Sequence, residues 1–377
     1  MILLASMLVT FVLGSVHAFS VFILPLESIL RLPRSEISLI YSFALVAITA
    51  SVLLGYRIYT ALPPWWLLLF TCLTAAAGLY IASFTLNWWG LFIGYSLLFG
   101  LSNGVGYGYS LQLVGREMPE IKGLAMGAVT AAYAVGSIVF AKIFALRIAN
   151  SSIDAAFVSL AYGLLICGIA AALLMWLAGA SYDRQRHRRN EADTNMDMRK
   201  LLQFWLAYMS SVLAGLMAIG HAAGIALWKD SSIELSTLSA MMIGIGSATG
   251  GFLSGWLIDR WPATRFLVGL PLLSALALLL INLSHNPAIV VALLTLVGFS
   301  YGSVIAIYPV VISNYFGTRG AQAYGRVFTA WGFAGLFGPW IAGLIYDWRG
   351  GYELALILAA AIALLSALIA GLSSLET

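Results

Sequence analysis

Residues 352–372 read YELALILAAAIALLSALIAGL, and Glu353 is the single charged side chain in this stretch. A bilayer core about 30 Å thick is crossed by about 20 apolar residues in a helix, because each residue rises about 1.5 Å. The stretch is therefore long and apolar enough to span a membrane. Eleven further stretches of the same kind precede it in the 377-residue chain.

The composition of the whole chain agrees with this interpretation. Hydrophobic residues make up 62% of the chain, charged residues make up 9%, and the mean hydropathy is +0.96. A soluble domain carries about 25% charged residues, so no water-soluble fold hides this much apolar surface. The expected spans are 2–24, 37–56, 65–84, 90–115, 124–146, 154–180, 201–227, 236–258, 266–285, 288–312, 326–346 and 352–372.

The spans are predicted to be helices. They are longer and more uniformly apolar than the alternating segments of about ten residues that form barrel strands. A helix also satisfies its own backbone hydrogen bonds within lipid. The sequence therefore predicts an all-α integral membrane protein with 12 transmembrane helices.

The distribution of basic residues predicts the orientation. With both termini in the cytoplasm, 13 of the 19 Lys and Arg residues fall on the inner side and 6 on the outer side. Loops on the cytoplasmic side of membrane proteins carry the excess of basic residues. We therefore expect a multi-pass protein of the cell inner (cytoplasmic) membrane with both termini cytoplasmic. The first apolar run starts at Met1 with no basic segment before it, so we expect it to be retained as a span.

One long polar stretch divides the chain. It covers residues 181–200, contains RQRHRR at 184–189, and separates six spans from six. We expect an N-terminal six-helix bundle at 1–180, a cytoplasmic basic linker, and a C-terminal six-helix bundle at 201–377. A solvated linker that fixes the orientation is preferred to a lipid-specific or nucleic-acid-binding role, so no nucleic-acid partner is expected.

The two halves share glycine spacings. GLSNG at 100–104 and GFSYG at 298–302 are separated by 198 residues, and Gly127 and Gly325 have the same separation. Several glycines at one offset suggest the duplication of a six-span unit. Such repeats are the plan of many secondary transporters, whose binding site lies at the midplane between the halves.

Two segments then carry a family resemblance. GWLIDR at 255–260, with Arg265 after it, resembles the loop between spans 8 and 9 of the major facilitator superfamily, and GLFGP at 335–339 resembles the pattern of its gating helices. The resemblance covers the whole chain and implies the major facilitator fold. Glycine permits close helix approach and proline frees a backbone carbonyl, which suits a helix that bends. A gating role is implied for Asp259, Arg260, Arg265, Gly335, Gly338 and Pro339.

A closer resemblance is to the branch that contains oxalate/formate antiporters and monocarboxylate porters. It is carried by GSVHAFSVF at 14–22, LPRSEIS at 32–38, NGVGYG at 103–108 with KGLAMG at 122–127, and GLMAIGHAA at 215–223. The chain departs from this branch where antiporters hold a dicarboxylate with an Arg and a Lys, because Gly251 and Trp331 stand at those positions. The charge clamp for a small dianion is therefore missing.

Two histidines are the principal candidates for chemistry. His17 lies in the first span and His221 in the seventh, which the resemblance makes equivalent cavity-lining helices. An ionisable residue within a membrane span is a functional candidate, and histidine titrates near neutral pH. We expect the pair to flank a cavity and to bind a carboxylate when protonated, although each imidazole also suits a plain interhelical hydrogen bond.

Uncharged polar side chains on the expected cavity helices are further candidates. Hydroxyl and amide groups orient a carboxylate without carrying charge, and they also join helices by hydrogen bonds. A large indole suits either the wall of a substrate cavity or core packing, and a lone basic group near the outer surface either snorkels or contacts anions. These candidates are Asn103, Tyr107, Tyr301, Tyr308, Trp331 and Lys142.

The function expected from these patterns is secondary active transport of a small organic anion, with monocarboxylates as the expected class, coupled to protons or to exchange. A larger, weakly charged compound such as a siderophore or drug is the alternative substrate. A polytopic membrane enzyme is the other class, but no His-Glu-x-x-His or Gly-x-Ser-x-Gly pattern is present, so we expect no enzyme activity.

The remaining expectations concern partners. Cys72 and Cys167 lie inside spans without metal-ligand spacing, so no metal, cofactor or disulfide framework is expected. The expected partners are a small-molecule substrate, protons and the lipid bilayer, and the protein is expected to act as a monomer.

Overall fold

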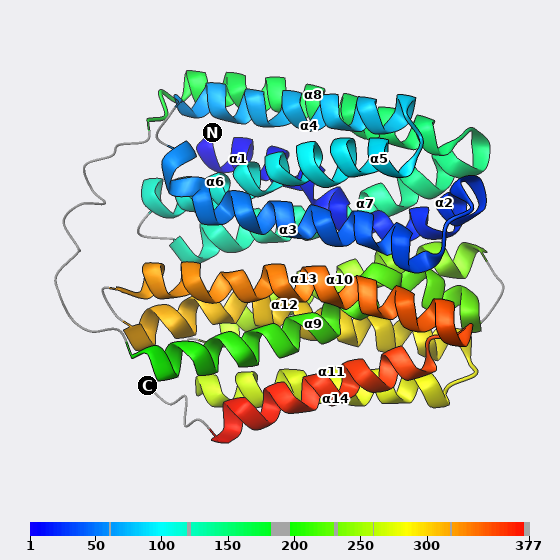
Figure 1. The fold of residues 1–377 in the computed structure, drawn as a ribbon. Coiled ribbons are helices and arrows are strands. Elements are labelled where there is room, and N and C mark those ends of the chain that lie inside the picture. Colours follow the sequence, from blue (N-terminus) through cyan, green and yellow to red (C-terminus); the bar gives the residue numbers. More distant parts are fainter. Residues whose placement is uncertain are drawn as a thin grey trace.

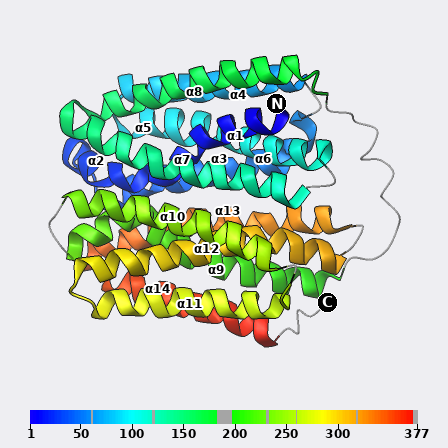
Figure 2. The same cartoon turned by 180° about the vertical axis from the view of Figure 1, so that it is seen from behind.

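The computed structural model describes residues 1–59, 62–118, 122–181, 197–229, 233–258, 260–316 and 319–372. Within these ranges the chain forms twelve helical spans that run roughly side by side (Figure 1). The predicted all-α architecture of two six-helix halves is therefore confirmed. Both termini lie at the same end of the molecule in Figures 1 and 2, and we call the opposite end the distal end.

The first half contains two spans that are built from more than one helical segment. Its elements are α1 (Ile2–Leu13), η1 (Gly14–Phe22), α2 (Ile23–Leu30), α3 (Arg34–Ile58), α4 (Pro64–Phe84), α5 (Trp88–Leu91), η2 (Phe92–Phe99), α6 (Gly100–Glu117), α7 (Lys122–Asn150) and α8 (Ile153–Leu177). The first span is α1, η1 and α2 in succession, and the fourth is α5, η2 and α6.

The second half consists of six continuous α-helices. They are α9 (Met198–Lys229), α10 (Ile233–Leu257), α11 (Ala263–Leu283), α12 (Pro287–Phe316), α13 (Gly320–Arg349) and α14 (Glu353–Leu372). Most of the expected linker falls on residues 182–196, outside the described residues. The three residues from Met198 to Lys200, which the sequence analysis assigned to the linker, are instead the first turn of α9.

Local sequence signals fix several helix ends. Asn87 and Ser152 accept hydrogen bonds from the backbone of Gly90 and Ala155, at 2.8 and 3.2 Å, and so cap α5 and α8. At the other end of a helix, Arg31 and Gly350 take left-handed conformations and end α2 and α13. These short polar turns are the loops that separate the apolar stretches.

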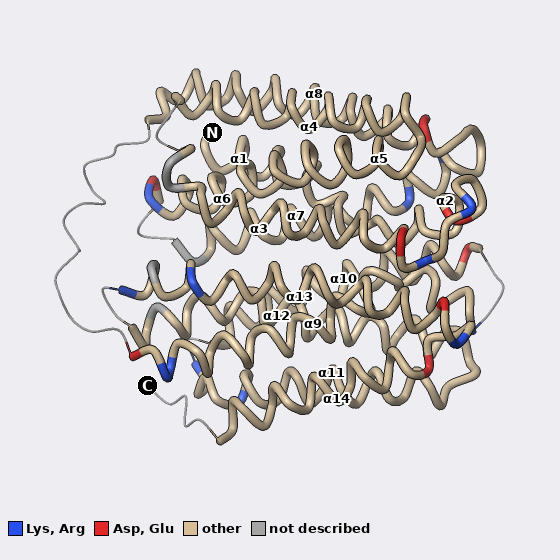
Figure 3. Tube along the Cα trace, viewed as in Figure 1, with Lys and Arg blue, Asp and Glu red and all other residues tan. Residues whose placement is uncertain are grey.

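Eleven of the helices in the described residues are long and apolar enough to cross a bilayer by length and composition. The remaining span, residues 88–117, is divided by the π-helical segment η2, and α6 is rich in glycine and polar residues. This span packs on α3 and α4 inside its half. Figure 3 shows the charged residues gathered toward the two ends, with an uncharged middle that matches a bilayer core.

The repeated glycines pack in the same way in both halves. A Cβ on Gly104 would lie 2.3 Å from the carbonyl oxygen of Ile48 in α3, and one on Gly302 would lie 2.0 Å from that of Ser247 in α10. These glycines bring span 4 against span 2, and span 10 against span 8. The glycine offset read from the sequence therefore corresponds to an equivalent helix contact in each half.

Several pairs of helices join the two halves. α3 packs against α13, α7 packs against α10, and η1 packs against α9. The helices α4 and α8 lie together at one edge of the molecule, and α11 and α14 lie together at the opposite edge (Figures 1 and 2). Spans 1, 2, 5, 7, 8 and 11 thus contribute to the interface between the halves.

Candidate functional site

His17 lies at the centre of the first span, in the 3₁₀ segment η1. Its Nδ1 is 2.8 Å from the hydroxyl oxygen of Tyr41, and its ring meets the rings of Tyr133 and Tyr301 edge-on at centroid distances of 5.7 and 6.2 Å. The imidazole is partly accessible despite this depth. Among the described residues Nε2 has no hydrogen-bond partner, so this nitrogen is available to a ligand.

The 3₁₀ segment is held in place by close contacts with α7 and α6. A Cβ on Gly14 would lie 1.8 Å from the carbonyl oxygen of Tyr133, so the two backbones touch. The Asn103 amide donates to the carbonyl oxygen of Leu13 at 2.6 Å, directly where α1 gives way to η1. The hydroxyl of Tyr133 donates to the Asn103 amide oxygen at 2.9 Å. Asn103 is fully buried and positions its neighbours.

The second half contributes an aromatic pair to the same place. The indole N–H of Trp331 in α13 donates to the hydroxyl of Tyr301 in α12 at 2.9 Å. The indole also stacks on Phe328, with ring centroids 5.6 Å apart and an interplanar angle of 8°. On the first-half side, Tyr107 packs on Tyr133 at 4.8 Å and lies 3.5 Å from the Thr130 hydroxyl.

We call these six side chains the central cluster: His17, Tyr41, Tyr107, Tyr133, Tyr301 and Trp331. They come from spans 1, 2, 4, 5, 10 and 11, and thus from both halves. The cluster offers phenol and imidazole donors between aromatic walls, and it contains no Lys, Arg, Asp or Glu. Its chemistry therefore suits hydrogen bonding to a small polar or singly charged group.

Two members, Tyr41 and Tyr133, were not among the sequence candidates. The offset of 198 residues relates Asn103 to Tyr301 and Tyr133 to Trp331. This offset could therefore have identified Tyr133 as the counterpart of Trp331. In each half the aromatic residue of span 5 or 11 donates to the polar residue of span 4 or 10. The repeat therefore preserves a hydrogen bond although both positions of the pair carry a different residue in each half.

Two other sequence candidates lie outside the central cluster. Lys142 is exposed on α7, and no hydrogen bond or ion pair involves it within the described part of the chain. Tyr308 is buried on α12, where its ring packs on Tyr208 at 4.6 Å. Its hydroxyl has no hydrogen-bond partner among the described residues.

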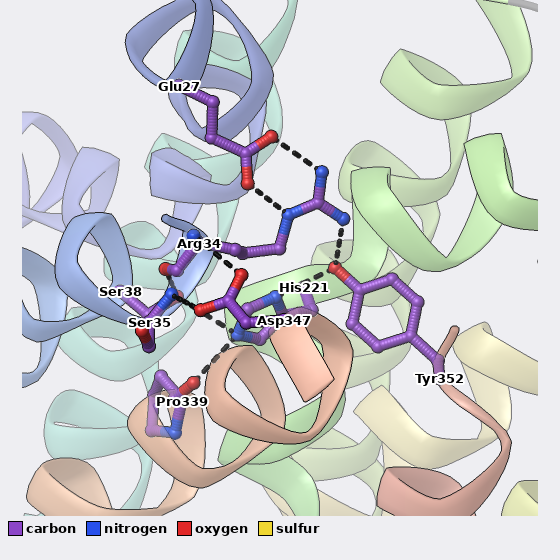
Figure 4. Close-up of polar contacts among 8 residues, drawn as sticks. All are labelled: Glu27, Arg34, Ser35, Ser38, His221, Pro339, Asp347 and Tyr352. Carbon is purple, nitrogen blue, oxygen red and sulfur yellow. Dashed lines mark hydrogen bonds and ion pairs between the residues drawn. The ribbon is translucent and has the colours of Figure 1, made fainter. Parts of the chain in front are cut away.

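His221 is placed differently from His17. It is fully buried and belongs to a polar network near the distal end (Figure 4). Its Nε2 is 2.7 Å from the carbonyl oxygen of Pro339 and 3.3 Å from the Ser38 hydroxyl, and its Nδ1 is 2.9 Å from the Tyr352 hydroxyl. The expected pair of histidines flanking one cavity is therefore not the arrangement found. His17 contacts Tyr41 and His221 contacts Ser38, and these two partners lie one turn apart on α3.

The same network joins the two halves through Arg34. This residue was assigned to an outer loop from sequence, but it is the buried first residue of α3. Its guanidinium forms an ion pair with Glu27 and donates to the Tyr352 hydroxyl at 2.9 Å. It also lies 3.7 Å from the centroid of the Tyr346 ring, which adds a cation–π contact.

Asp347 of the second half caps a helix of the first half. Its two carboxylate oxygens accept from the backbone N–H groups of Arg34 and Ser35, at 2.9 and 2.8 Å. Pro33 precedes α3 and has no side-chain acceptor of its own. The carboxylate therefore satisfies two otherwise unpaired donors and meets the positive end of the helix dipole.

We call this group the distal network: Glu27, Arg34, Ser35, Ser38, His221, Pro339, Asp347 and Tyr352. The Tyr352 side chain is a phenol, which ordinarily loses its proton only at about pH 10. The phenol therefore keeps its proton and acts as a neutral donor. α3 of the first half contacts α13 and Tyr352 of the second half in this network. These contacts hold the distal ends of the two halves together.

The residues assigned to gating by resemblance occupy two regions. Gly335 packs on Leu45 of α3, with a Cβ distance of 2.7 Å, and Gly338 faces Leu213 of α9 at 3.2 Å. Pro339 contacts Gly220 and accepts the hydrogen bond from His221. At the other end of the molecule, Arg260 lies over the Trp256 ring at 3.8 Å and Arg265 is exposed, whereas Asp259 lies outside the described residues.

Metal binding finds no support in the part of the chain that the structure describes. No group of three or more His, Cys, Asp or Glu side chains lies close enough there to hold a metal ion.

The Trp331→Phe variant tests the second-half pair of the central cluster. Phenylalanine keeps the stacking on Phe328 but removes the indole N–H, so the Tyr301 hydroxyl loses a donor. We expect a loss of about 1 kcal/mol of stability, the usual net value of a neutral hydrogen bond. Thermal denaturation in detergent measures this, with Trp348→Phe at an exposed position as the control; an unchanged melting temperature contradicts the assigned contact.

The comparisons with known proteins agree with the fold. The sequence model of the Major Facilitator Superfamily matches residues 3–322. The uncharacterized MFS-type transporter YhjX of Escherichia coli (strain K12) is 25% identical over 355 residues, covering 89% of this chain and 85% of that protein. The oxalate:formate antiporter of Oxalobacter formigenes is 25% identical over 274 residues, covering 69% of this chain and 65% of that protein.

Solved structures share the architecture at low sequence identity. The xylose transporter XylE from E. coli, in a partially occluded inward open conformation, superposes with a TM-score of 0.72 at 14% identity, covering 97% of this chain and 95% of that one. A bacterial homolog of the human lysosomal transporter Spinster, inward-facing and occupied, gives 0.70 at 13% identity, covering 100% and 96%. The chain is therefore a multi-pass membrane transporter that belongs to the major facilitator superfamily.

Proposed function

We propose that the protein is a secondary active transporter of a small organic monoanion, with monocarboxylates as the substrate class. The two halves rock about the central cluster, which binds the substrate, and movement is coupled to protons or to exchange of a second anion. We further propose that it acts as a monomer in the cell inner membrane with both termini cytoplasmic, as the basic residues favour. The distal end then faces outward.

The observation that carries this proposal is the convergence of both halves on one imidazole. His17 is the single member of the central cluster that gains a positive charge when it binds a proton. One positive charge matches one carboxylate, whereas a dianion needs a second cation that the cluster does not provide. An uncompensated charge in a low-dielectric site is costly, so charge matching favours a monoanion.

The geometry of His17 gives a means of coupling. When protonated, it donates from Nδ1 to the Tyr41 hydroxyl and keeps the Nε2 proton for the substrate. Tyr107, Tyr133 and Tyr301 supply walls and hydroxyl groups around that nitrogen. Loss of the proton removes the charge that holds the carboxylate, which links release of the anion to release of the proton.

The likeness to the oxalate:formate antiporter adds support from sequence. The name of that relative states that it acts on oxalate and on formate, and formate is a monocarboxylate. In this chain Gly251 and Trp331 occupy the positions that the family resemblance makes basic in the antiporter. Such a change removes positive charge from the site, which disfavours a dianion and favours a singly charged substrate.

The alternative is a larger, weakly charged substrate such as a siderophore or drug. It is favoured by the aromatic character of the central cluster and by the absence from that cluster of Lys and Arg. Tyrosine and tryptophan bind apolar surface while also offering a hydrogen bond. The two proposals differ in whether binding depends on the His17 proton.

A thermal-shift series on the purified protein separates them. Formate, acetate, lactate, oxalate and an aromatic neutral compound are each added near pH 5.5 and near pH 7.5. A ligand at about 100 times its Kd stabilises the folded state by about 2.7 kcal/mol. We expect stabilisation by a monocarboxylate, stronger at the lower pH, and its loss in His17→Gln.

Lys142→Gln is the matched control, because it removes a nitrogen cation outside the central cluster. It should leave the monocarboxylate shift unchanged. Stabilisation by the neutral compound alone, with no effect of His17→Gln, favours the alternative substrate. Stabilisation by oxalate that exceeds that by every monocarboxylate contradicts the monoanion proposal.

A further inference from the structure

In the distal network, residues of the second half make two kinds of contact: some with the first half and one within the second half. Asp347 and Tyr352 lie in the second half, and both bind groups of the first half, namely the N-terminus of α3 and the Arg34 guanidinium. His221 also lies in the second half and contacts Tyr352. The second half therefore has an internal group that competes for the side chains that tie the halves together.

The hydrogen-bond partners define the protonation state of His221. A carbonyl oxygen only accepts, so Nε2 carries a proton and donates to Pro339. A guanidinium only donates, so the Tyr352 oxygen accepts from Arg34 and its own proton is directed to Nδ1 of His221. In this closed arrangement His221 is neutral, with Nδ1 as the acceptor.

A second proton on His221 reverses the bond at Nδ1. The Tyr352 oxygen then faces two cationic donors, Arg34 and His221, and has no acceptor for its own proton. At the same time the carboxylate of Asp347, which lies beside His221 in Figure 4, gains a cation within its own half. Both changes draw partners of the second half away from α3.

We propose that His221 is the proton-binding residue of a distal gate, and that its protonation releases Asp347 and Tyr352 from α3 and opens the distal end. This assigns separate roles to the two histidines. His17 holds the substrate anion in the central cluster, and His221 sets which side of the membrane the cluster faces. The inference rests on the proposed alternating access, and it adds the group that couples the gate to external protons.

A route for the proton lies beside the network. A cavity of about 260 Å³ is lined by Leu24, Arg34, Gly224, Leu227, Trp228 and Tyr346. Gly224 and Arg34 line this cavity and also meet the Tyr352 hydroxyl, because a Cβ on Gly224 would lie 2.5 Å from the hydroxyl oxygen and Arg34 donates to it, so the cavity adjoins the phenol. A hydronium ion there gives a proton to the Tyr352 oxygen while Tyr352 passes its own proton to Nδ1, and a water molecule remains.

The charged and titratable groups around His221 come from several elements. They are Glu27 of α2, Arg34 of α3, His17 of η1 beyond Tyr41, Tyr346 and Asp347 of α13, Tyr352 before α14, and Lys229 at the end of its own helix. Among its described partners, α10, α11 and α12 contribute no charged side chain. The group thus contains the ion pair of Glu27 with Arg34 and the Asp347 carboxylate at the N-terminus of α3, and the added proton compensates the charge of Asp347.

The test measures the distal gate directly and without substrate. Spin labels are placed at Ser151→Cys and His285→Cys, in exposed distal loops of the first and second half, in a Cys72→Ala/Cys167→Ala background. Double electron–electron resonance in lipid nanodiscs then reports the populations of short and long label distances. We expect the long-distance population to rise by about tenfold between pH near 7.5 and pH near 5.5.

His221→Gln removes the titration while keeping a donor for Pro339 and an acceptor for Tyr352. We expect its distance distribution to stay closed at both pH values, and Lys142→Gln, a control outside both the central cluster and the distal network, to respond as the parent does. A full pH response in His221→Gln overturns the proposal, because Glu27 and Asp347 are unchanged in that variant. A parent that does not respond to pH overturns it as well.

Tyr352→Phe gives an independent check that does not depend on the folding of His221→Gln. It removes the acceptor of Arg34 and the donor to His221 together, so the long-distance population should rise at both pH values. A distribution identical to that of the parent contradicts the proposal. The distance measurement uses no substrate, so a negative result in it does not affect the monoanion proposal. A negative result in the thermal-shift series likewise does not affect the measurement of the gate.

Discussion

Gly136→Ala is expected to lower the melting temperature of the protein by about 5 °C and to abolish ligand-induced stabilisation. A Cβ at Gly136 of α7 would lie 1.7 Å from the carbonyl oxygen of Phe11 in α1. Ordinary contact requires the two backbones to separate by about 2 Å. Alanine favours a helix over glycine by about 1 kcal/mol, but overpacking of this kind costs about 1–3 kcal/mol or more, so the clash prevails.

The displacement also reaches the central cluster. Gly14, one turn nearer the centre on the same interface, touches the backbone of Tyr133, and His17 follows three residues later in η1. Moving α1 away from α7 therefore separates His17 from Tyr133. Thermal denaturation and the ligand shift measure the two effects.

Gly127→Ala in the same helix is the matched control, because no atom lies within 4 Å of its added Cβ. We expect this variant to be as stable as the parent or slightly more stable. Equal melting temperatures for Gly136→Ala and the parent would show that α1 and α7 do not approach as closely as described.

Asp347→Ala is expected to favour the distally open state by about 100-fold. The carboxylate accepts two charge-assisted hydrogen bonds from the N-terminus of α3 across the halves. Such bonds contribute about 1.5–3 kcal/mol each, and water satisfies part of the demand once the gate opens. A net change of about 3 kcal/mol corresponds to the stated ratio. The labels at Ser151→Cys and His285→Cys measure it.

Asp197→Ala provides a control with the same chemistry inside one half. The Asp197 carboxylate accepts from the backbone of Arg199 and Lys200 at 3.0 and 3.1 Å and caps α9. Its removal should reduce stability by about 1 kcal/mol and leave the label distances unchanged. An equal shift toward the open state in both variants would mean that loss of any helix cap, rather than loss of the cross-half contact, controls the gate.

Much of the fold follows from the sequence because lipid imposes a simple rule. Each apolar stretch must be a helix of about bilayer length, and the loops that contain Pro33, Asn87 or Gly350 end or start helices by local chemistry. The span at residues 88–117 was also predicted, although its glycines lower its hydropathy. The π-helical segment in that span carries no sequence signal that periodicity detects.

The central cluster was predictable in part. His17 and Tyr301 were selected because polar groups are rare within spans, and the structure brings them together. Tyr133 was missed because a tyrosine in a glycine-rich span resembles core packing, although its offset from Trp331 marks it as that residue's counterpart. Only the tertiary structure shows that Tyr41 turns toward His17.

The distal network was the least predictable part. Arg34 and Asp347 are far apart in the chain, and both stand beside helix ends where charged residues usually face solvent. Nothing in the local sequence of α3 reveals that its N-terminus is capped from the other half. His221 was recognised as unusual, but its partners Pro339 and Tyr352 depend on the packing of α9 against α13 and α14.

The 3₁₀ segment in the first span has a mechanical consequence. Its 9 residues rise about 2.0 Å each rather than about 1.5 Å, so Gly14–Phe22 is about 4–5 Å longer than the same residues in an α-helix. It also completes about three turns instead of about two and a half. Rewinding it as an α-helix would shorten the span and rotate one end against the other by about half a turn. In the first span, a change in length along the helix axis is therefore coupled to a rotation of the His17 face. The equivalent helix of the other half, α9, is a continuous α-helix and has no 3₁₀ segment that allows this coupling.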